Sequence, residues 1–244
     1  MTNSNFNFDV VHPSWQACLK QALTQMDPHY LEKLQTTQSW LPGPQNIFSA
    51  FSLPVEQVNY LLFGESPYPR ALSANGYAFW DAQVNELWSP EGMTKKVNRA
   101  TSLRNLIKML LVAEGLLTPP QLSQPDIVAI DKSHLIQTNQ EFFQNLLNEG
   151  FLLLNASLVL NTGEVKKDAK AWQPFLKTLI EFLMDQKPQL KLILFGNIAQ
   201  VLEKFLPLAS FQRLAVEHPY NHSFITRPEV LAFFKPLHLL RKKS

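Results

Sequence analysis

Four apolar runs in the sequence each end in polar or turn-forming residues. Gly64-Glu65-Ser66 follows the first run, Asn155 the second, Gly196-Asn197 the third and Glu217-His218 the fourth. If the runs are parallel strands, these groups share one edge of a sheet, which is where open α/β sheets place their chemistry. An amide, an imidazole and a turn of backbone N–H groups suit the recognition of a flat heterocycle better than the hydrolysis of a peptide or ester.

Aromatic residues lie close behind the first of these turns. Pro67 and Pro69 stiffen the loop, and Tyr77, Phe79 and Trp80 come next. A rigid polar turn beside flat aromatic faces can hold a planar ring. The alternative interpretation is a packed strand-to-helix connection.

Two other kinds of chemistry fit the sequence less well. Ser66 and His218 could act as nucleophile and base, but Ser66 lacks the G-x-S-x-G elbow of the α/β hydrolases. The six histidines show no ligand spacing such as H-E-x-x-H, and Cys18 is the only cysteine. We therefore expect no metal site and no intrachain disulfide.

Buried strands are expected at the apolar runs, over residues 60–63, 151–154, 190–195 and 211–216. Helical patterns separate them, and this alternation predicts an α/β fold with a mainly parallel sheet covered on both faces. The first helix is expected to have Ser14 as its cap, and another begins with the capping box Thr138-x-x-Glu141. Residues 1–244 contain no internal repeat, and we interpret them as a single domain.

The composition is typical of a soluble intracellular protein. The 244 residues are 45% hydrophobic, and 22 Lys+Arg against 20 Asp+Glu give a formal net charge of +2. Such a balance confines any DNA contact to a local patch, for which the tail Arg241-Lys-Lys243 is one candidate and a solvated terminus the alternative. The N-terminus lacks the regions of a signal peptide, and no apolar run of about 18 uncharged residues occurs. We expect a cytoplasmic location.

Five segments match, in order, the motifs of one known family. Its G-Q-D-P-Y-H and G-L-C-F motif is matched by Gly64-Glu-Ser-Pro-Tyr-Pro69 with Gly76-Tyr-Ala-Phe79, and its L-L-L-N-A strand by Leu152-Leu-Leu-Asn-Ala156. Its P-P-P-S-L, W-G-S-x-A-Q and H-P-S-P-L-S motifs are matched by Ala100-Thr-Ser-Leu103, Phe195-Gly-Asn-Ile-Ala-Gln200 and His218-Pro-Tyr-Asn-His-Ser223. The chain thus resembles the uracil-DNA glycosylase superfamily, most closely its family 1 enzymes. Residues 113–137 look like an insertion relative to that family.

The resemblance implies a three-layer α/β/α fold with a central four-stranded, mainly parallel sheet. It implies a base-excision repair enzyme that flips deoxyuridine out of DNA and hydrolyses its N-glycosidic bond. It also implies that neither a metal nor a cofactor takes part. The expected partner is DNA, single- or double-stranded and uracil-containing or abasic, bound by a monomer with no membrane involved.

The resemblance assigns roles around the base. Asn155 corresponds to the asparagine that reads uracil, Phe79 to the aromatic that stacks on it, and Tyr68 to the side chain that blocks the C5 position against thymine. His218 corresponds to the histidine that hydrogen-bonds uracil O2 as the base leaves. The alternatives are a strand cap for Asn155, core packing for Phe79 and Tyr68, and a surface position for His218.

The resemblance also assigns DNA contacts. Backbone-clamping positions, whose hydroxyl or N–H groups grip phosphates, fall on Ser102, Gly196, Asn197 and Ser223. Ser102 could instead be a helix N-cap.

Several positions depart from the family pattern. The water-activating aspartate is Ser66 here, its neighbouring glutamine is Glu65 and the closing histidine is Pro69. In the last motif a clamping serine is Tyr220, and the leucine that fills the vacated space is His222. Both rings could still wedge into a base step. A serine orients water without carrying charge, which implies a loss of roughly 10²–10⁴-fold in rate.

Three functions therefore stay open on the sequence alone. The first is excision of uracil, with Glu65 or Asp81 as candidate sources of the missing carboxylate. The second is a non-catalytic relative that binds DNA or another partner. The third is a glycosylase for another lesion. Glu65 can accept a hydrogen bond from a proton-bearing base edge that the family's glutamine at this position would not accept.

Overall fold

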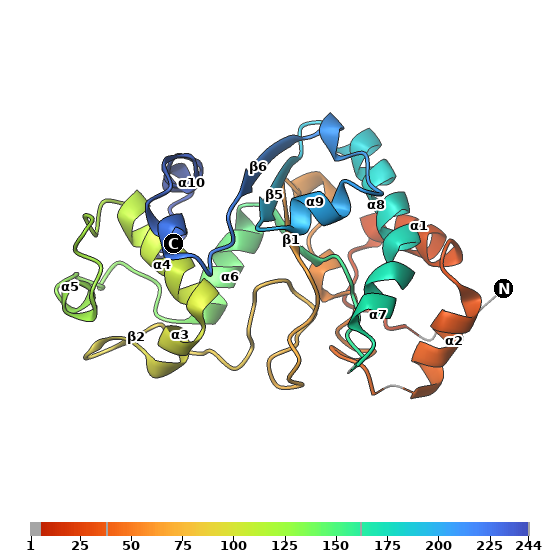
Figure 1. The fold of residues 1–244 in the computed structure, drawn as a ribbon, viewed down its shortest axis with the longest axis horizontal. Helices are drawn as coiled ribbons and strands as arrows, with labels where there is room; N and C mark the ends of the chain where they lie inside the picture. The colour runs from red at the N-terminus through yellow and green to blue at the C-terminus, as the bar shows by residue number, and fades with distance from the viewer. Residues whose placement is uncertain (1–5, 38, 162, 244) are drawn as a thin grey trace. The chain divides into compact units, whose positions relative to one another are not determined.

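A parallel sheet of four strands lies at the centre of the fold (Figure 1). The computed structural model describes residues 6–37, 39–161 and 163–243. The sheet order is β4-β1-β5-β6, formed by Tyr60–Gly64 (β1), Phe151–Asn155 (β4), Lys191–Phe195 (β5) and Gln212–Val216 (β6). Each strand begins and ends within one residue of its expected position. The predicted α/β class is confirmed.

Side chains on both faces of the inner strands are buried. Alternate residues of a strand point to opposite faces, so Leu61 and Phe63 join one apolar core while Leu62 points the other way and is also buried. In the parallel register Leu62 pairs with Leu153 of β4 and Ile193 of β5, which are buried too. The expectation of a buried fourth strand is wrong. β6 ends the sheet order, and its side chains are exposed or half-buried.

Helices alternate with the strands as the sequence predicts. The longer ones are Pro13–Thr24 (α1), Pro28–Thr37 (α2), Thr101–Ala113 (α4), Asn139–Asn148 (α6) and Gln173–Gln186 (α8). The shorter ones are Lys95–Arg99 (α3), Gln124–Val128 (α5), Val165–Ala171 (α7), Ile198–Leu202 (α9) and Pro228–Phe234 (α10). A small antiparallel pair joins Trp88–Ser89 (β2) to Gly92–Met93 (β3). Short 3-10 turns are Ser49–Ser52, Val55–Gln57, Leu208–Ser210, His222–Thr226 and Lys235–Leu237. Within the described ranges, no helix is both long enough and apolar enough to cross a membrane.

Two helix starts test the capping expectations. At α6, the Thr138 hydroxyl accepts the Glu141 N–H at 3.1 Å and the Glu141 carboxylate accepts the Thr138 N–H at 2.7 Å, so the predicted capping box is confirmed. Ser14 as the cap of α1 is wrong. The helix begins at Pro13, and His12 is its N-cap, with Nδ1 accepting the backbone N–H of Ser14.

The chain divides into two compact units. Unit 1 comprises residues 1–82, 150–194 and 198–213, and unit 2 comprises residues 83–149, 195–197 and 214–244. In unit 1, α1 packs against α8, and their apolar faces join β1, β4 and β5 in one core. In unit 2, α4 packs against α10 and the 3-10 turn that begins at His222. The interpretation of the chain as a single domain stays a prediction.

Candidate active site

Asn155 ends β4 and lies beside Gly64, which ends β1. The two residues pair in the parallel register, and Asn155 is only 4% exposed. A β-carbon added to Gly64 would stand 2.4 Å from Asn155 Oδ1 and 2.9 Å from Ala78 Cβ. Both distances are too short for carbon, so only glycine lets the amide lie against the end of β1.

Backbone hydrogen bonds continue beyond these strand ends. The Ala156 N–H donates to the Gly64 carbonyl at 2.8 Å, and the Ser157 N–H donates to the Glu65 carbonyl at 3.0 Å. The Ser157 hydroxyl donates to the Val159 carbonyl at 2.6 Å. The residues that follow Asn155 are thus fixed to the turn after β1, which preorganises the amide for a hydrogen-bonding ligand.

Tyr68 and Phe79 are joined to each other. The Tyr68 hydroxyl donates to the Phe79 carbonyl at 3.1 Å. Phe79 has a φ of 64°, a left-handed conformation that is unusual for a bulky residue. Burial, and next the charge of Asp81, raise the pKa of Tyr68 to about 12. The phenol therefore stays neutral and keeps its donor at physiological pH.

The carboxylates near this turn have different surroundings. Glu65 is exposed and Ser66 is half-buried. Asp81 is buried, and its Oδ2 lies 3.0 Å from Nη2 of Arg70. Because Asp81 is already paired with a cation, Glu65 is the better placed of the two to supply a charge.

Gly196 and His218 form a second group, in unit 2. Gly196 follows β5 with a φ of 70°, a conformation that favours glycine, and its N–H donates to the Val216 carbonyl at 2.8 Å. A β-carbon on Gly196 would stand 3.0 Å from His218 Cβ. The glycine thus lets His218 lie against the turn after β5. Asn197, the next residue, is exposed.

The His218 ring is oriented by the backbone that follows it. The Tyr220 N–H donates to Nδ1 of His218 at 3.1 Å. A ring nitrogen that accepts a hydrogen bond carries no proton, so a neutral His218 has its proton on Nε2. His218 is thereby prepared to donate through Nε2. Tyr220 is 66% exposed, and His222 is exposed as well.

The two serines expected to clamp phosphates differ in their surroundings. The Ser223 hydroxyl donates to the Glu217 carboxylate at 2.6 Å, so it is engaged within unit 2. Ser102 is half-buried and is the second residue of α4. The alternative in which Ser102 caps this helix is wrong, because Ala100 is the N-cap residue.

Sequence reasoning missed Asn105, a buried residue of α4. Its side-chain N–H group donates to the Pro219 carbonyl at 2.8 Å and lies 3.3 and 3.4 Å from the carbonyls of Tyr220 and Asn221. Asn105 is 2% exposed. The segment after His218 is therefore tied to α4 by one amide. An asparagine on the apolar face of an expected helix is the signal that could have found it.

Comparison with known proteins finds relatives along most of the chain. No family model matches it. The uracil-DNA glycosylase of Enterococcus faecalis is 26% identical over 220 residues, which cover 87% of this chain and 82% of that enzyme. The uracil-DNA glycosylase of Fusobacterium nucleatum is 25% identical over 218 residues, which cover 86% and 81%. The crystal structure of the UNG from Nitratifractor salsuginis has a TM-score of 0.92 at 39% identity and covers 97% of this chain and 96% of its own. The chain belongs to the uracil-DNA glycosylase family.

The expected family is therefore confirmed, and with it an enzyme that acts as a DNA N-glycosylase. The mimivirus uracil-DNA glycosylase, at 19% identity and a TM-score of 0.58, shares the fold. Among the residues that the structure describes, no group of three His, Cys, Asp or Glu side chains is placed to hold a metal ion. The residue roles inside this glycosylase stay predictions.

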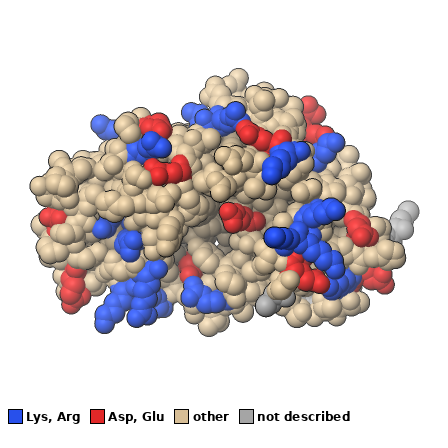
Figure 2. All heavy atoms as spheres, in the orientation of Figure 1, with Lys and Arg blue, Asp and Glu red and all other residues tan. Residues whose placement is uncertain are grey.

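Positive charge gathers over two helices of the glycosylase. Lys and Arg side chains form groups over α3 and over α7 (Figure 2). In unit 2, Lys95 and Arg99 of α3 are exposed, and α3 directly precedes α4. The cations of the C-terminal tail are exposed or half-buried, and each is engaged with another part of the chain. Arg241 lies 3.0 Å from Glu114, and Lys243 also contacts a carboxylate. The α3 group is therefore the better candidate for a DNA patch.

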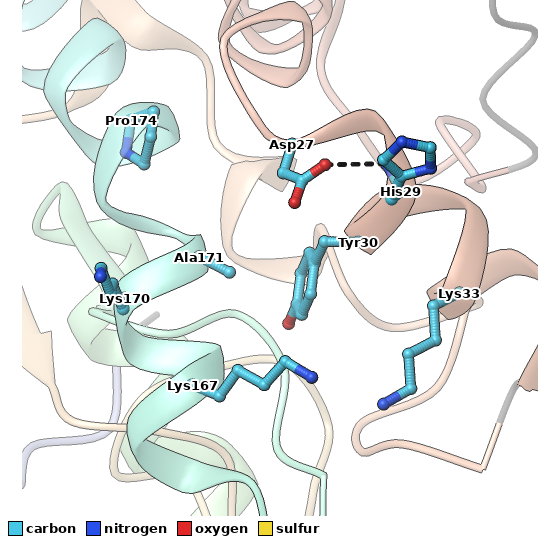
Figure 3. Close-up of a pocket in the computed structure, with 8 residues that line it drawn as sticks. All are labelled: Asp27, His29, Tyr30, Lys33, Lys167, Lys170, Ala171 and Pro174. Carbon is cyan, nitrogen blue, oxygen red and sulfur yellow. Dashed lines mark hydrogen bonds between the residues drawn. The ribbon is translucent and has the colours of Figure 1, made fainter.

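Unit 1 also contains a cavity of about 490 Å³ beside α2 and α7. It is lined by Asp27, His29, Tyr30, Lys33, Lys167, Lys170, Ala171 and Pro174 (Figure 3). Glu164 pairs with Lys33 at 2.8 Å and with Lys167 at 3.6 Å. The Tyr30 hydroxyl donates to buried Asp168 at 2.8 Å. Because these polar groups are engaged with one another, we assign the cavity no part in the reaction.

Proposed function

We propose that this glycosylase removes uracil from DNA by extruding deoxyuridine and hydrolysing its N-glycosidic bond. The proposal rests on Asn155, whose buried amide lies against Gly64 at the carboxyl ends of two paired strands. One amide can donate to uracil O4 and accept from N3–H, whereas cytosine presents the reverse pattern. Phe79 stacks on the base, and Tyr68 closes its C5 side, which excludes thymine.

His218 stabilises the departing base. Its Nδ1 accepts from the Tyr220 N–H, so Nε2–H is the donor offered to uracil O2 as negative charge develops there. A preorganised neutral donor at a developing oxyanion lowers the barrier without having to transfer a proton.

Ser66 orients the attacking water in place of the usual aspartate. Its hydroxyl carries no charge, so we expect excision to be slower than with a carboxylate by roughly 10²–10⁴-fold. Glu65, one residue earlier and exposed, is the alternative source of negative charge. The substitution Glu65→Gln separates the two, because it leaves the rate unchanged if Ser66 acts alone.

The DNA backbone is gripped by Ser102, Gly196, Asn197 and Ser223, with support from the exposed cations of α3. Ser223 exchanges its bond to Glu217 for a phosphate. Tyr220 and His222 wedge into the vacated base step. We propose a monomer that acts in the cytoplasm, where its one cysteine, the buried Cys18, stays reduced.

The test is formation of abasic sites on single-stranded uracil DNA, detected by alkaline strand cleavage. We expect slow excision by the wild type, excision faster by roughly 10²-fold or more in Ser66→Asp, and none in His218→Ala. A silent wild type rescued by Ser66→Asp would indicate a decayed enzyme. Silence in all three, without binding to uracil or abasic DNA, would refute DNA processing.

A further inference from the structure

Two contacts join the ends of the loop that carries Tyr68 and Phe79, the two aromatic walls of the proposed base pocket. The Tyr68 hydroxyl donates to the Phe79 carbonyl at 3.1 Å. Two residues further along from each partner, Arg70 Nη2 lies 3.0 Å from Asp81 Oδ2. Each contact joins the start of the segment 68–81 to its end. The two contacts therefore close the same loop.

The burial of this ion pair is unequal. The Asp81 side chain is 7% exposed and the Arg70 side chain is 63% exposed. A nearly buried carboxylate is costly unless a cation and hydrogen bonds satisfy it, so removal of the cation affects it strongly. The planar guanidinium keeps its charge and presents several donors to a carboxylate. Arg70 therefore fastens the start of the loop to a fixed point at its end.

Phe79 depends on such support. Its φ of 64° is a strained conformation for a phenylalanine and persists only where the surroundings fix it. On one side, the Ala78 N–H donates to the Leu153 carbonyl of β4 at 3.0 Å. On the C-terminal side of Phe79, two residues along the chain, Asp81 is held by its pair with Arg70. The carbonyl that accepts the Tyr68 hydroxyl belongs to Phe79 itself, so the position of Tyr68 depends on the same backbone conformation.

We propose that the Arg70–Asp81 ion pair sets base specificity by holding Tyr68 and Phe79 together at the C5 side of the base. This inference rests on the proposed function, in which Tyr68 blocks C5 and Phe79 stacks. Arg70 and Asp81 act through these two residues and are positioning residues. When the pair is broken, Tyr68 withdraws and pyrimidines with a C5 substituent enter the pocket.

The experiment measures single-turnover excision from single-stranded DNA that contains uracil, thymine or 5-hydroxymethyluracil. Wild type is compared with Arg70→Ala, Asp81→Asn and Arg70→Lys, each also in a Ser66→Asp background so that a low rate does not hide the ratio. We expect Arg70→Ala to raise the ratio of 5-hydroxymethyluracil to uracil excision about tenfold, which corresponds to about 1.4 kcal/mol. Arg70→Lys retains a cation and should restore part of the discrimination.

Two controls accompany these variants. Arg213→Ala removes a pair with Glu203 in unit 1 whose side chains are both exposed, and it should leave the ratio unchanged. Tyr68→Ala removes the block itself and should raise the ratio further than Arg70→Ala. Thermal melting identifies variants that do not fold. In that case the double variant Arg70→Ala/Asp81→Asn provides the test, because it leaves no buried charge unpaired.

The results distinguish failure of the ion-pair inference from failure of the proposed function. An unchanged ratio in folded Arg70→Ala, together with a raised ratio in Tyr68→Ala, overturns the role of the ion pair and leaves the proposed function intact. An equal loss on all three bases in Arg70→Ala is a structural effect and also overturns it. An unchanged ratio in Tyr68→Ala overturns the role of the ion pair and the proposed role of Tyr68, because Tyr68 would not lie at C5. Loss of uracil excision in the wild type and in Ser66→Asp is the separate result that overturns the proposed function.

Discussion

Gly64 is the point at which β1 meets the side-chain amide of Asn155, which is proposed to read the base. Gly64 is not among the residues of the described chain that have a positive φ, so the reason for glycine at this position is space. Asn155 Oδ1 and Ala78 Cβ occupy the volume that a β-carbon would fill. One added methyl group must therefore displace the amide or the backbone beside it.

We expect Gly64→Ala to lower kcat/KM for uracil excision by roughly 10²-fold, because a shift of about 1 Å in a positioning group has that effect. Excision from single-stranded DNA and the midpoint of thermal unfolding are measured on the same preparation. The control is Gly43→Ala, where φ is 86° and no atom lies within 4 Å of the added carbon. That change strains the backbone by about 1 kcal/mol away from the site. Equal losses of activity in both variants would contradict this account of Gly64.

Some site residues can be found from the sequence and others cannot. Asn155 and His218 stand directly after apolar runs, so the strand pattern alone brings them to notice. Arg70 and Asp81 are 11 residues apart in a loop, and no helix or strand period relates them. Their contact follows from the path of the loop, which depends on bonds to β4 that no local pattern encodes.

At the scale of elements, α4 holds the segment after His218 through one buried amide. Asn105 has a close counterpart in unit 2. Asn145 of α6 is 5% exposed and donates to the carbonyls of Leu239 and Arg241, each at 2.9 Å. The two asparagines make the same kind of bond, but only Asn105 does so beside a residue proposed to act on the base.

We expect Asn105→Ala and Asn145→Ala each to lower the free energy of unfolding by about 1–3 kcal/mol, because buried carbonyls lose their donor. Only Asn105→Ala should also slow excision, since it releases the backbone that orients the His218 ring. Urea unfolding and single-turnover rates at saturating enzyme separate the two effects. If Asn145→Ala slows excision equally, the loss reflects stability and not the orientation of His218.

The helix α3 is expected to contribute charge to DNA binding. The double variant Lys95→Gln/Arg99→Gln should weaken binding and reduce the slope of log affinity against log salt by roughly 1–2, because each lost phosphate contact removes about one unit. Fluorescence anisotropy with labelled abasic DNA, from about 50 to 200 mM salt, measures the slope. Lys166→Gln/Lys170→Gln on α7 removes the same charge and should leave the slope unchanged. If the α7 variant reduces the slope and the α3 variant does not, the DNA patch lies on α7 instead.

The strands were predictable from the sequence, whereas the start of the first helix and the exposure of the last strand were not. Apolar runs bounded by turn residues locate each strand to within one residue. The start of α1 differs because a histidine ring nitrogen replaces the expected serine as the capping acceptor. The two end strands of the sheet differ, since β4 is buried at every residue whereas β6 is exposed or half-buried. That difference depends on long-range packing that a local pattern does not specify.

At the scale of the molecule, unit 1 carries four acidic groups whose ionisation is suppressed. Burial raises the pKa of Cys18 from 9.0 to about 12 and is the main cause that raises the pKa of Tyr68 to about 12. Burial also raises the pKa of Tyr30 and of Tyr77. Each of these groups keeps its proton in the folded protein at a pH where the unfolded chain has lost it.

We therefore expect the free energy of unfolding to fall as pH rises above about 9. Between pH 9 and 12 the unfolded chain releases the Cys18 proton and the folded protein retains it, which favours unfolding by up to about 1.4 kcal/mol per pH unit for each group. Urea unfolding between pH 7 and 11 measures this slope. Cys18→Ala should move its onset toward pH 10, where the tyrosines begin to titrate. An onset unchanged by that substitution would show that Cys18 does not contribute.

Unit 1 is built from segments that are far apart in the sequence, so it cannot finish folding until the later segments have been synthesised. Residues 1–82 supply α1 and β1, whereas β4, α8 and β5 come after residue 150. A ribosome adds roughly 5–20 residues per second, so the apolar sides of α1 and β1 wait on the order of ten seconds for the segments that cover them. A nascent chain in this state exposes the surfaces that chaperones bind and that aggregate when chaperones are scarce. The yield of native enzyme is therefore expected to depend on the translation rate and on chaperone supply.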